Sequence, residues 1–192
     1  MPQGGDVNEH SPNPGGEQEE RAVTQGAAGS TANGPVFRGV SHLALDAKGR
    51  LAIPARYREA LQATAADPAA PPTGQPSLVL TVDPSRCLLL YPRAAWEPIQ
   101  ARLMSLSSFN EPIRRLQRLL VGHADDVDLD GAGRILVSAE LRQYAGLGHR
   151  VVLVGQGNKF EVWDEPRWLE QTAQAITFSA GELPPELDGF SL

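Results

Sequence analysis

The sequence of 192 residues contains a single cysteine, Cys87, and no apolar run near the roughly 18 residues that a membrane-spanning helix requires. One cysteine cannot form an internal disulfide, and no second cysteine is available to complete a zinc site with the four scattered histidines. The N-terminus lacks a basic stretch followed by an apolar one, which predicts no secretory signal. We therefore expect a cytoplasmic protein without a membrane association.

Sequence patterns typical of catalysis are also missing. No ordered Ser, His and Asp set, no phosphate-binding glycine loop and no pair of carboxylates stands out, so we expect no enzyme, no cofactor and no small-molecule substrate. Asp126, Asp128 and Asp130, followed by Gly131, match the opening of a calcium-binding EF-hand loop. The twelfth position of such a loop requires a glutamate but holds Val137, so we predict no metal.

Nearly all basic residues in the middle part of the chain, residues 36–171, are arginines. The net charge is −6, but residues 1–35 carry −4 and residues 172–192 carry −3, which leaves +1 for residues 36–171. Of the 16 basic residues in that middle part, only Lys48 and Lys159 are lysines. Because the planar guanidinium group of arginine matches carboxylates, phosphates and guanine edges, this composition fits either polyanion recognition or dense ion pairing.

The two ends of the chain differ in composition from its middle. Residues 1–35 contain few sizeable apolar side chains, which predicts a disordered leader. A sharper hypothesis is that translation naturally starts at Val36, and an intact mass that includes residues 1–35 would exclude it. Residues 172–192 are predicted to form a C-terminal tail, of which 177–192, with two consecutive prolines, is expected to be loosely structured.

An internal repeat organises the middle of the chain. Residues 45–54 align with residues 129–138 through identical Leu, Asp, Gly and Arg at fixed spacing, and Arg58 matches Arg142 further on. Each copy is predicted to contain a strand, a tight turn, a strand, a short helix and two further strands. We therefore expect two units related by an approximate twofold axis. The predicted division is a first unit at 36–92 with an insertion at 62–76, a helical connector at 93–121 and a second unit at 122–171.

The predicted turns rest on acidic and glycine residues. Asp46 can accept hydrogen bonds from the turn backbone, and Gly49 can adopt a positive φ, as can Asp130 and Gly133 in the second copy. Asn110 and Ser138 are predicted to cap helices. The predicted strands are 40–45, 51–53, 78–82, 87–91, 151–154 and 160–163, and the predicted helices are 54–61, 93–106, 111–121, 138–144 and one that begins at Asp164.

These motifs together resemble the MraZ family of bacterial DNA-binding regulators. The resemblance covers residues 36–171 and includes both Asp-x-x-x-Arg turns, the opening Phe-Arg-Gly at 37–39, and the segments at 118–124 and 153–163. It implies an α+β fold made of two tandem AbrB/SpoVT-type swapped-hairpin β-barrel units with short helices. The sequence departs from the family in the leader and in the insertion at 62–76.

The resemblance also implies a function. Family members are nucleoid-associated proteins that form ring-shaped homo-oligomers and bind tandem short G-rich repeats in double-stranded promoter DNA. These repeats lie upstream of the division and cell-wall gene cluster, and the proteins usually repress their own operon. The Asp-x-x-x-Arg turn carries the DNA contacts, which places them at Asp46, Lys48 and Arg50 in the first copy and at Asp130 and Arg134 in the second.

The two copies differ in charge. Residues 36–61 carry +3 and residues 120–145 carry −3, so we expect the first copy to approach the phosphate backbone. The predicted DNA contacts are Lys48, Arg50, Arg38 and Arg56, and the residues predicted to structure the turns are Asp46, Gly49, Asp130, Gly133 and Arg134. An alternative for Arg50 is a purely structural ion pair with Asp46, and Arg56 and Arg58 can equally be solvated or paired with Glu59.

Two other functions stay open at this point. One is a ring-forming protein that binds a protein partner and contacts DNA only weakly, and the other is an antitoxin of the same fold superfamily. Tyr91 and Trp96 in the first copy recur as Trp163 and Trp168 in the second. This recurrence is expected of anchors in a core or a subunit interface rather than of base-stacking residues.

Overall fold

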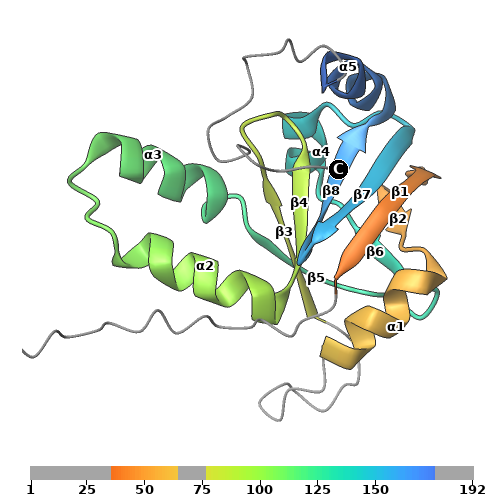
Figure 1. Ribbon diagram of the computed structural model, residues 1–192, viewed down its shortest axis with the longest axis horizontal. Coiled ribbons are helices and arrows are strands. Elements are labelled where there is room, and N and C mark those ends of the chain that lie inside the picture. The colour runs from red at the N-terminus through yellow and green to blue at the C-terminus, as the bar shows by residue number, and fades with distance from the viewer. Residues whose placement is uncertain (1–35, 65–76, 176–192) are drawn as a thin grey trace, which may run out of the picture. The chain divides into compact units, whose positions relative to one another are not determined.

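The computed structural model describes residues 36–64 and 77–175 (Figure 1). The predicted leader at 1–35 lies outside the described residues, as do residues 65–76 of the predicted insertion at 62–76 and residues 176–192 of the predicted tail at 172–192. Residues 62–64 and 172–175 are helical. In chain order the elements are β1 (Phe37–Ala44), β2 (Arg50–Ala52), α1 (Ala55–Thr64), β3 (Ser77–Val82), β4 (Leu88–Pro92), α2 (Arg93–Ser105), α3 (Glu111–Leu120), β5 (Asp125–Asp128), β6 (Arg134–Leu136), α4 (Ala139–Ala145), β7 (Arg150–Gly157), β8 (Lys159–Asp164) and α5 (Glu165–Ala175).

The larger sheet draws its strands from both repeats. Its order is β1-β7-β8-β4-β3-β5, and all its pairs are antiparallel. Strand β1 of the first repeat pairs along its whole length with β7 of the second, and β5 of the second repeat pairs with β3 of the first. The α+β class is therefore confirmed. Within the described residues the expected barrel is not closed, because β1 and β5 end the sheet and do not pair with each other.

Strands β2 and β6 form a separate two-stranded ribbon between the repeats. Arg50 pairs with Leu136 and Ala52 with Arg134 in an antiparallel register. The pairing extends symmetrically beyond the strands, because Ile53 N–H donates to Gly133 O and Val137 N–H donates to Gly49 O, each at 2.9 Å. Equivalent positions of the two repeats thus face each other, as the predicted twofold relation requires.

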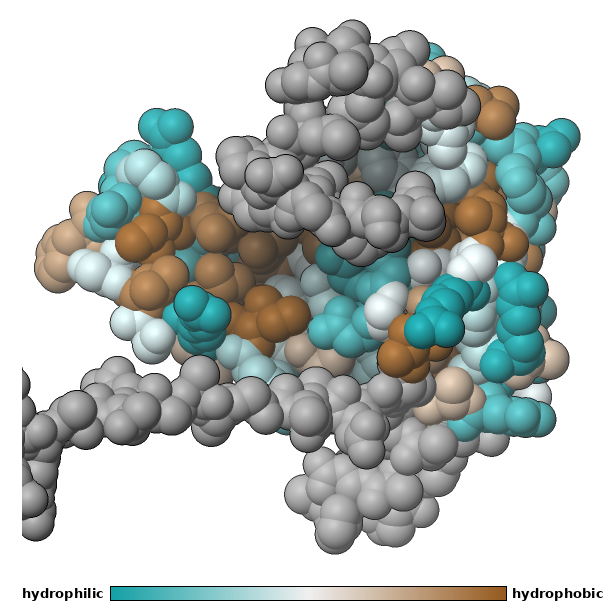
Figure 2. Space-filling view, viewed as in Figure 1, coloured by the Kyte–Doolittle hydropathy of each residue, from teal (hydrophilic) through white to brown (hydrophobic). Residues whose placement is uncertain are grey.

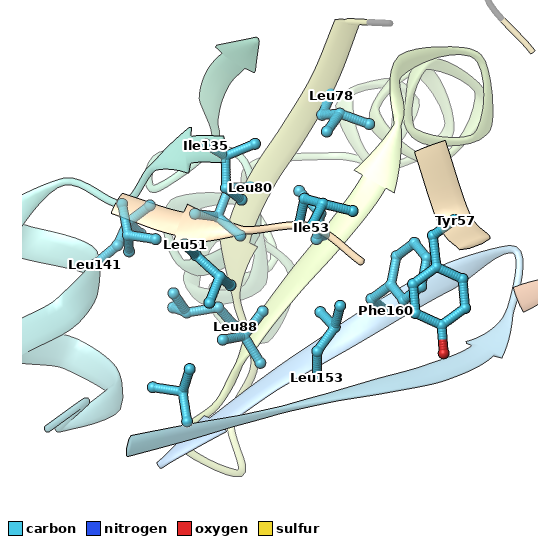
Figure 3. Close-up of a cluster of buried hydrophobic side chains, with 14 of the residues drawn as sticks. Leu51, Ile53, Tyr57, Leu78, Leu80, Leu88, Ile135, Leu141, Leu153 and Phe160 are labelled. Carbon is cyan, nitrogen blue, oxygen red and sulfur yellow. The ribbon is translucent and has the colours of Figure 1, made fainter. Parts of the chain in front are cut away.

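The main core lies beneath this ribbon. Leu51, Ile53, Ile135 and Val137 alternate with outward residues along β2 and β6, and all four are fully buried. Figure 3 shows Leu51 and Ile53 directed toward apolar side chains of β4, β7 and β8. The ribbon is therefore anchored by its inner face, and only its outer face is available to a ligand.

A second core covers another part of the sheet. Its aromatic members are Tyr91 and Trp96, whose ring centroids are 5.6 Å apart, and Trp163 and Trp168, at 6.1 Å. The first three of these side chains are buried and Trp168 is partly buried, packed against the cluster. The sequence predicted that these aromatic residues anchor either a core or a subunit interface. The structure places them in a core.

The helix boundaries follow the predicted local signals. Ser138 Oγ accepts from Leu141 N at 3.4 Å at the start of α4, and Gly146 ends that helix with φ of 61°. Asn110 Oδ1 accepts from Ile113 N at 3.5 Å at the start of α3. Two strands are longer than predicted, since β7 ends at Gly157 and not at residue 154, and β1 begins at Phe37 and not at residue 40. Its register with β7, from Phe37 opposite Gly157, sets the true length.

Candidate nucleic-acid interface

The first Asp-x-x-x-Arg turn is built around the carboxylate of Asp46. Its Oδ1 accepts from Lys48 N at 2.9 Å and from Arg50 N at 3.0 Å, and its Oδ2 accepts from Arg50 Nε at 2.7 Å. Gly49 closes the turn with φ of 78°, a conformation that other residues rarely adopt. The Arg50 backbone N–H, together with the guanidinium and the Lys48 N–H, lowers the pKa of Asp46 from 3.8 to about 2.

The second turn has the same geometry. Asp130 Oδ1 accepts from Ala132 N at 2.9 Å and from Arg134 N at 3.0 Å, while Oδ2 accepts from Arg134 Nε at 2.9 Å. Gly133 has φ of 72°. The Arg134 guanidinium and its backbone N–H lower the pKa of Asp130 to about 2. The turn-structuring residues named from the sequence therefore all lie in these two turns, and the repeat extends to individual hydrogen bonds.

The two turns share one exposed face. Side chains of a cross-strand pair point to the same side of a ribbon, so Arg50 and Arg134 lie on the outer face opposite the buried Leu51 and Ile135. Diagonal neighbours of this kind have Cα atoms roughly 7–8 Å apart. Each arginine side chain is about one-third exposed, at 31% for Arg50 and 33% for Arg134. The ribbon thus presents two braced arginines as diagonal neighbours on one face, one near each end of the ribbon.

The turns also interact electrostatically. The pKa of Arg134 is raised mainly by its hydrogen bond to Asp130, and the charge of Asp46 in the other turn raises it further. The sequence-based expectation treated the +3 and −3 segments as separate surfaces. In the folded chain they are interleaved, because the ribbon takes one strand from each, and Asp126 of the acidic segment pairs with Arg93 at 2.9 Å. The charge difference along the sequence is therefore not a separation in space.

Lys48 distinguishes the first turn from the second. It is exposed at the tip of the turn, and its side chain makes no hydrogen bond or ion pair with any residue that the structure describes. The equivalent position in the second turn is Ala132. The first turn therefore offers an additional free ammonium group, while both turns offer a braced guanidinium.

Arg38 and Arg56 lie away from the turns. Arg38 is exposed on β1 opposite Gln156. Strand β1 ends at Ala44, just before the first turn, and Ala44 is six residues, or about 20 Å of strand, from Arg38. Arg56 donates through Nη2 to Ser41 Oγ at 2.6 Å and to the Tyr57 hydroxyl at 2.8 Å. The four predicted DNA contacts thus form two groups, Lys48 with Arg50 and Arg38 with Arg56. Arg56 bonds to β1 and its neighbour instead of to Glu59.

Two arginines contact the turns in a way that the sequence did not predict, and one of them, Arg58, was expected to be solvated or paired with Glu59. Arg142 lies against Gly49, and Arg58 lies against Gly133. The available signal was their equivalent position in the two copies of the repeat. Across the described ranges, no group of three or more His, Cys, Asp or Glu side chains is arranged to hold a metal ion, and no helix is long and apolar enough to cross a membrane.

Comparison with known proteins agrees with the repeat. The sequence profile of the family described as "MraZ protein, putative antitoxin-like" matches the chain twice, over residues 36–119 and 120–186. The chain belongs to the MraZ family. The resemblance inferred from the motifs is therefore confirmed, including its division into two repeats.

Curated MraZ relatives match over their full length. A protein of Nitrosomonas eutropha is 54% identical over 157 residues, which are 82% of this chain and 100% of that protein. A protein of Nitrosospira multiformis is 55% identical over the same extent, and one of Coxiella burnetii is 47% identical over 163 residues. Each is named transcriptional regulator MraZ. The chain is thus a member of a family of transcriptional regulators, which is not a class of enzymes.

Proposed function

We propose that this chain is a sequence-specific regulator that binds double-stranded promoter DNA through the outer face of the β2–β6 ribbon. The observation that carries the proposal is the pair of Asp-braced arginines on that face, Arg50 and Arg134, with the free Lys48 beside them. A two-stranded ribbon of this width fits the major groove of B-DNA. We further propose repression of the chain's own operon as the regulatory outcome.

The brace explains how such an arginine reads a base. Asp46 binds Arg50 Nε, while the two Nη groups form no hydrogen bond with the described residues. The guanidinium plane is thereby fixed, and its free end can donate two parallel hydrogen bonds to guanine O6 and N7. The sequence left two alternatives for Arg50, an ion pair with Asp46 or a contact with a base. Under this proposal both apply, because the ion pair orients the guanidinium group for the base contact.

Lys48 and the β1–α1 group are assigned to the DNA backbone. A flexible ammonium group at the tip of a turn suits a phosphate, and each neutralised phosphate releases condensed counterions. Arg38 and Arg56 carry further positive charge on the same repeat, at a distance that fits the adjacent backbone and not the same base pair. Tandem short G-rich repeats upstream of the division and cell-wall genes are the proposed target.

We also propose that the chain acts as a ring-shaped homo-oligomer. The hairpin formed by α2 and α3 exposes Met104, Leu106, Phe109 and Leu116, and Figure 2 shows hydrophobic surface over these two helices at the left of the view. An exposed apolar patch on a chain of this size indicates an interaction surface. Several subunits on tandem sites gain affinity through effective concentration, by roughly 10²–10⁴-fold.

The finer description of the fold belongs to the same proposal. We propose that 36–92 and 122–171 are AbrB/SpoVT-type swapped-hairpin units joined by the helical connector 93–121, between a leader at 1–35 and a tail at 172–192. The exchange of β1 and β5 between the repeats supports this assignment. The proposed location is the cytoplasm, in association with the nucleoid.

The test is binding of the chain to its own upstream DNA and to random DNA. Arg50→Ala removes one base contact and is expected to weaken specific binding by about 5- to 150-fold, which corresponds to ~1–3 kcal/mol. Lys48→Ala is expected to weaken binding to both DNAs and to lower the salt slope by about one. Arg150→Ala, an exposed arginine of β7 paired with Glu165, is the matched control. Unchanged binding by both interface variants would refute the proposal.

The alternative function is binding of a protein partner through the exposed α2–α3 hairpin, as an antitoxin or as another interaction protein. The apolar side chains of that hairpin are the observation in its favour. The two functions differ in their salt dependence. A DNA-binding regulator shows a steep loss of affinity with salt and a large ratio of specific to random binding, which a protein-binding module does not.

A further inference from the structure

Each turn of the interface is packed against an arginine of the other repeat. A Cβ atom on Gly49 would lie 2.9 Å from both Cζ and Nε of Arg142, which is closer than any side chain allows. A Cβ atom on Gly133 would overlap the guanidinium of Arg58. Gly49 and Arg58 belong to the first repeat, and Gly133 and Arg142 belong to the second. At both positions the contact is with the far end of an arginine side chain, so each turn glycine lies directly against an arginine of the opposite repeat, while the positive φ is what favours glycine there.

The ribbon pairing produces this crossed arrangement. Because Ile53 N–H donates to Gly133 O, helix α1, which follows directly, begins beside the second turn. Arg58 on α1 is fixed there by a hydrogen bond from Nε to Ile53 O at 2.7 Å. The symmetric bond from Val137 N–H to Gly49 O brings α4, with Arg142, beside the first turn. The same contact between an arginine and a turn glycine thus occurs twice, at equivalent positions of the two repeats. Such a recurrence is not expected if the arginine side chains were placed there by chance.

Arg142 differs from Arg58 in one respect that points to function. Its Nε is buried and has no hydrogen-bond partner among the residues described, whereas Arg58 Nε is satisfied. A buried donor without a partner lowers stability, and an apolar side chain such as leucine would occupy part of the same space without leaving a buried donor unpaired. An arginine at this position is therefore a poor choice for packing alone.

We propose that Arg142 and Arg58 are positioning residues, each of which holds the DNA-facing turn of the opposite repeat. The inference rests on the proposed DNA-binding function. The flat guanidinium packed on the glycine limits how far the turn can tilt relative to the ribbon. A turn held in its bound orientation loses less freedom on binding, so affinity rises without a direct contact to DNA. Arg142 thus acts through Arg50 and Lys48, and Arg58 acts through Arg134.

DNA binding by combined variants tests whether each arginine acts through the turn of the opposite repeat. Arg142→Leu is expected to weaken specific DNA binding about threefold to tenfold, with an unchanged or higher melting temperature. The same substitution is expected to have no further effect in a Lys48→Ala, Arg50→Ala background and its full effect in an Arg134→Ala background. Arg58→Leu is expected to show the reverse pattern. Gln143→Ala, an exposed neighbour of Arg142 on α4, is the matched control.

Three outcomes overturn the inference. Equal losses in both backgrounds mean that Arg142 contacts DNA itself, and losses that follow the melting temperature mean a structural role only. Unchanged binding in Arg142→Leu also excludes it.

A readout without DNA separates this inference from the proposed function. Amide hydrogen exchange at residues 47–49 is expected to accelerate in Arg142→Leu, with residues 131–133 unchanged, and the pattern should reverse in Arg58→Leu. If exchange changes in this way while the wild-type chain does not bind DNA, the positioning is correct and the proposed function is wrong. Because Arg58 also bonds to Ile53 O, Arg58→Lys is the second variant for that site.

Discussion

The acidic residue of each turn carries more of the local structure than its arginine does. Asp46 accepts three hydrogen bonds within its turn, two of them from backbone N–H groups, and Asp130 does the same. These are local contacts, so the residue types and their spacing were sufficient to predict the turns. The sequence left open whether Arg50 pairs with Asp46 or contacts DNA. The structure shows the ion pair through Nε, and the Nη groups form no hydrogen bond with the described residues.

The lowered pKa values predict a specific acid sensitivity. Because the pKa of Asp46 and of Asp130 falls from 3.8 to about 2 on folding, these carboxylates stabilise the chain above pH 4. That stabilisation is lost as the pH falls from about 4 to about 2. The double variant Asp46→Asn, Asp130→Asn is expected to lose stability less steeply over this range in urea unfolding. A slope equal to that of the unaltered chain would contradict the prediction.

The matching geometry of the turns predicts matching effects on stability. Arg50→Ala and Arg134→Ala each remove one bond to a partly exposed aspartate, so both are expected to lower the melting temperature by a few degrees at most. Differential scanning calorimetry of the two single variants measures the change. A large drop for Arg134→Ala with none for Arg50→Ala would show that the two turns are not structurally equivalent.

At the scale of elements, the β2–β6 ribbon joins the interface to the core. Leu51→Ala and Ile135→Ala each remove a fully buried side chain, so each is expected to cost about 2–5 kcal/mol of unfolding free energy. Leu136→Ala, on the outer face and 57% exposed, is the control and is expected to change stability by less than about 0.5 kcal/mol. Chemical denaturation of the three variants tests the assignment of inner and outer faces.

Helix boundaries were predictable and strand partners were not. Ser138, Gly146 and Asn110 act within one turn of helix, so their residue types predicted the ends of α4 and the start of α3. Strand β1 begins three residues before its predicted start because β7 supplies partners for Phe37 to Gly39. The exchange of strands between repeats depends on contacts between distant segments, which the local pattern does not contain.

At the scale of the whole molecule, the α2–α3 hairpin exposes four large apolar side chains, Met104, Leu106, Phe109 and Leu116. Phe109 at its tip is 95% exposed. Phe109→Glu is expected to reduce the oligomer mass in native mass spectrometry and to weaken binding to tandem DNA sites more than to a single site. Leu169→Glu on α5, at a position 59% exposed, is the control. An unchanged mass in Phe109→Glu would exclude the hairpin as the subunit interface.

Sequence alone determined the two turns, the repeat that contains them, the helix ends and the family. Each of these depends on residue types at short, fixed spacing, where a carboxylate or a glycine acts on its own neighbours. Tertiary structure decided that the turns lie at the two ends of one ribbon with Arg50 and Arg134 on its outer face. It also decided that strands from the basic and the acidic segment pair with each other, and that Arg142 and Arg58 each contact the turn of the opposite repeat. These features follow from the antiparallel register of β2 with β6, which brings together residues far apart in the chain.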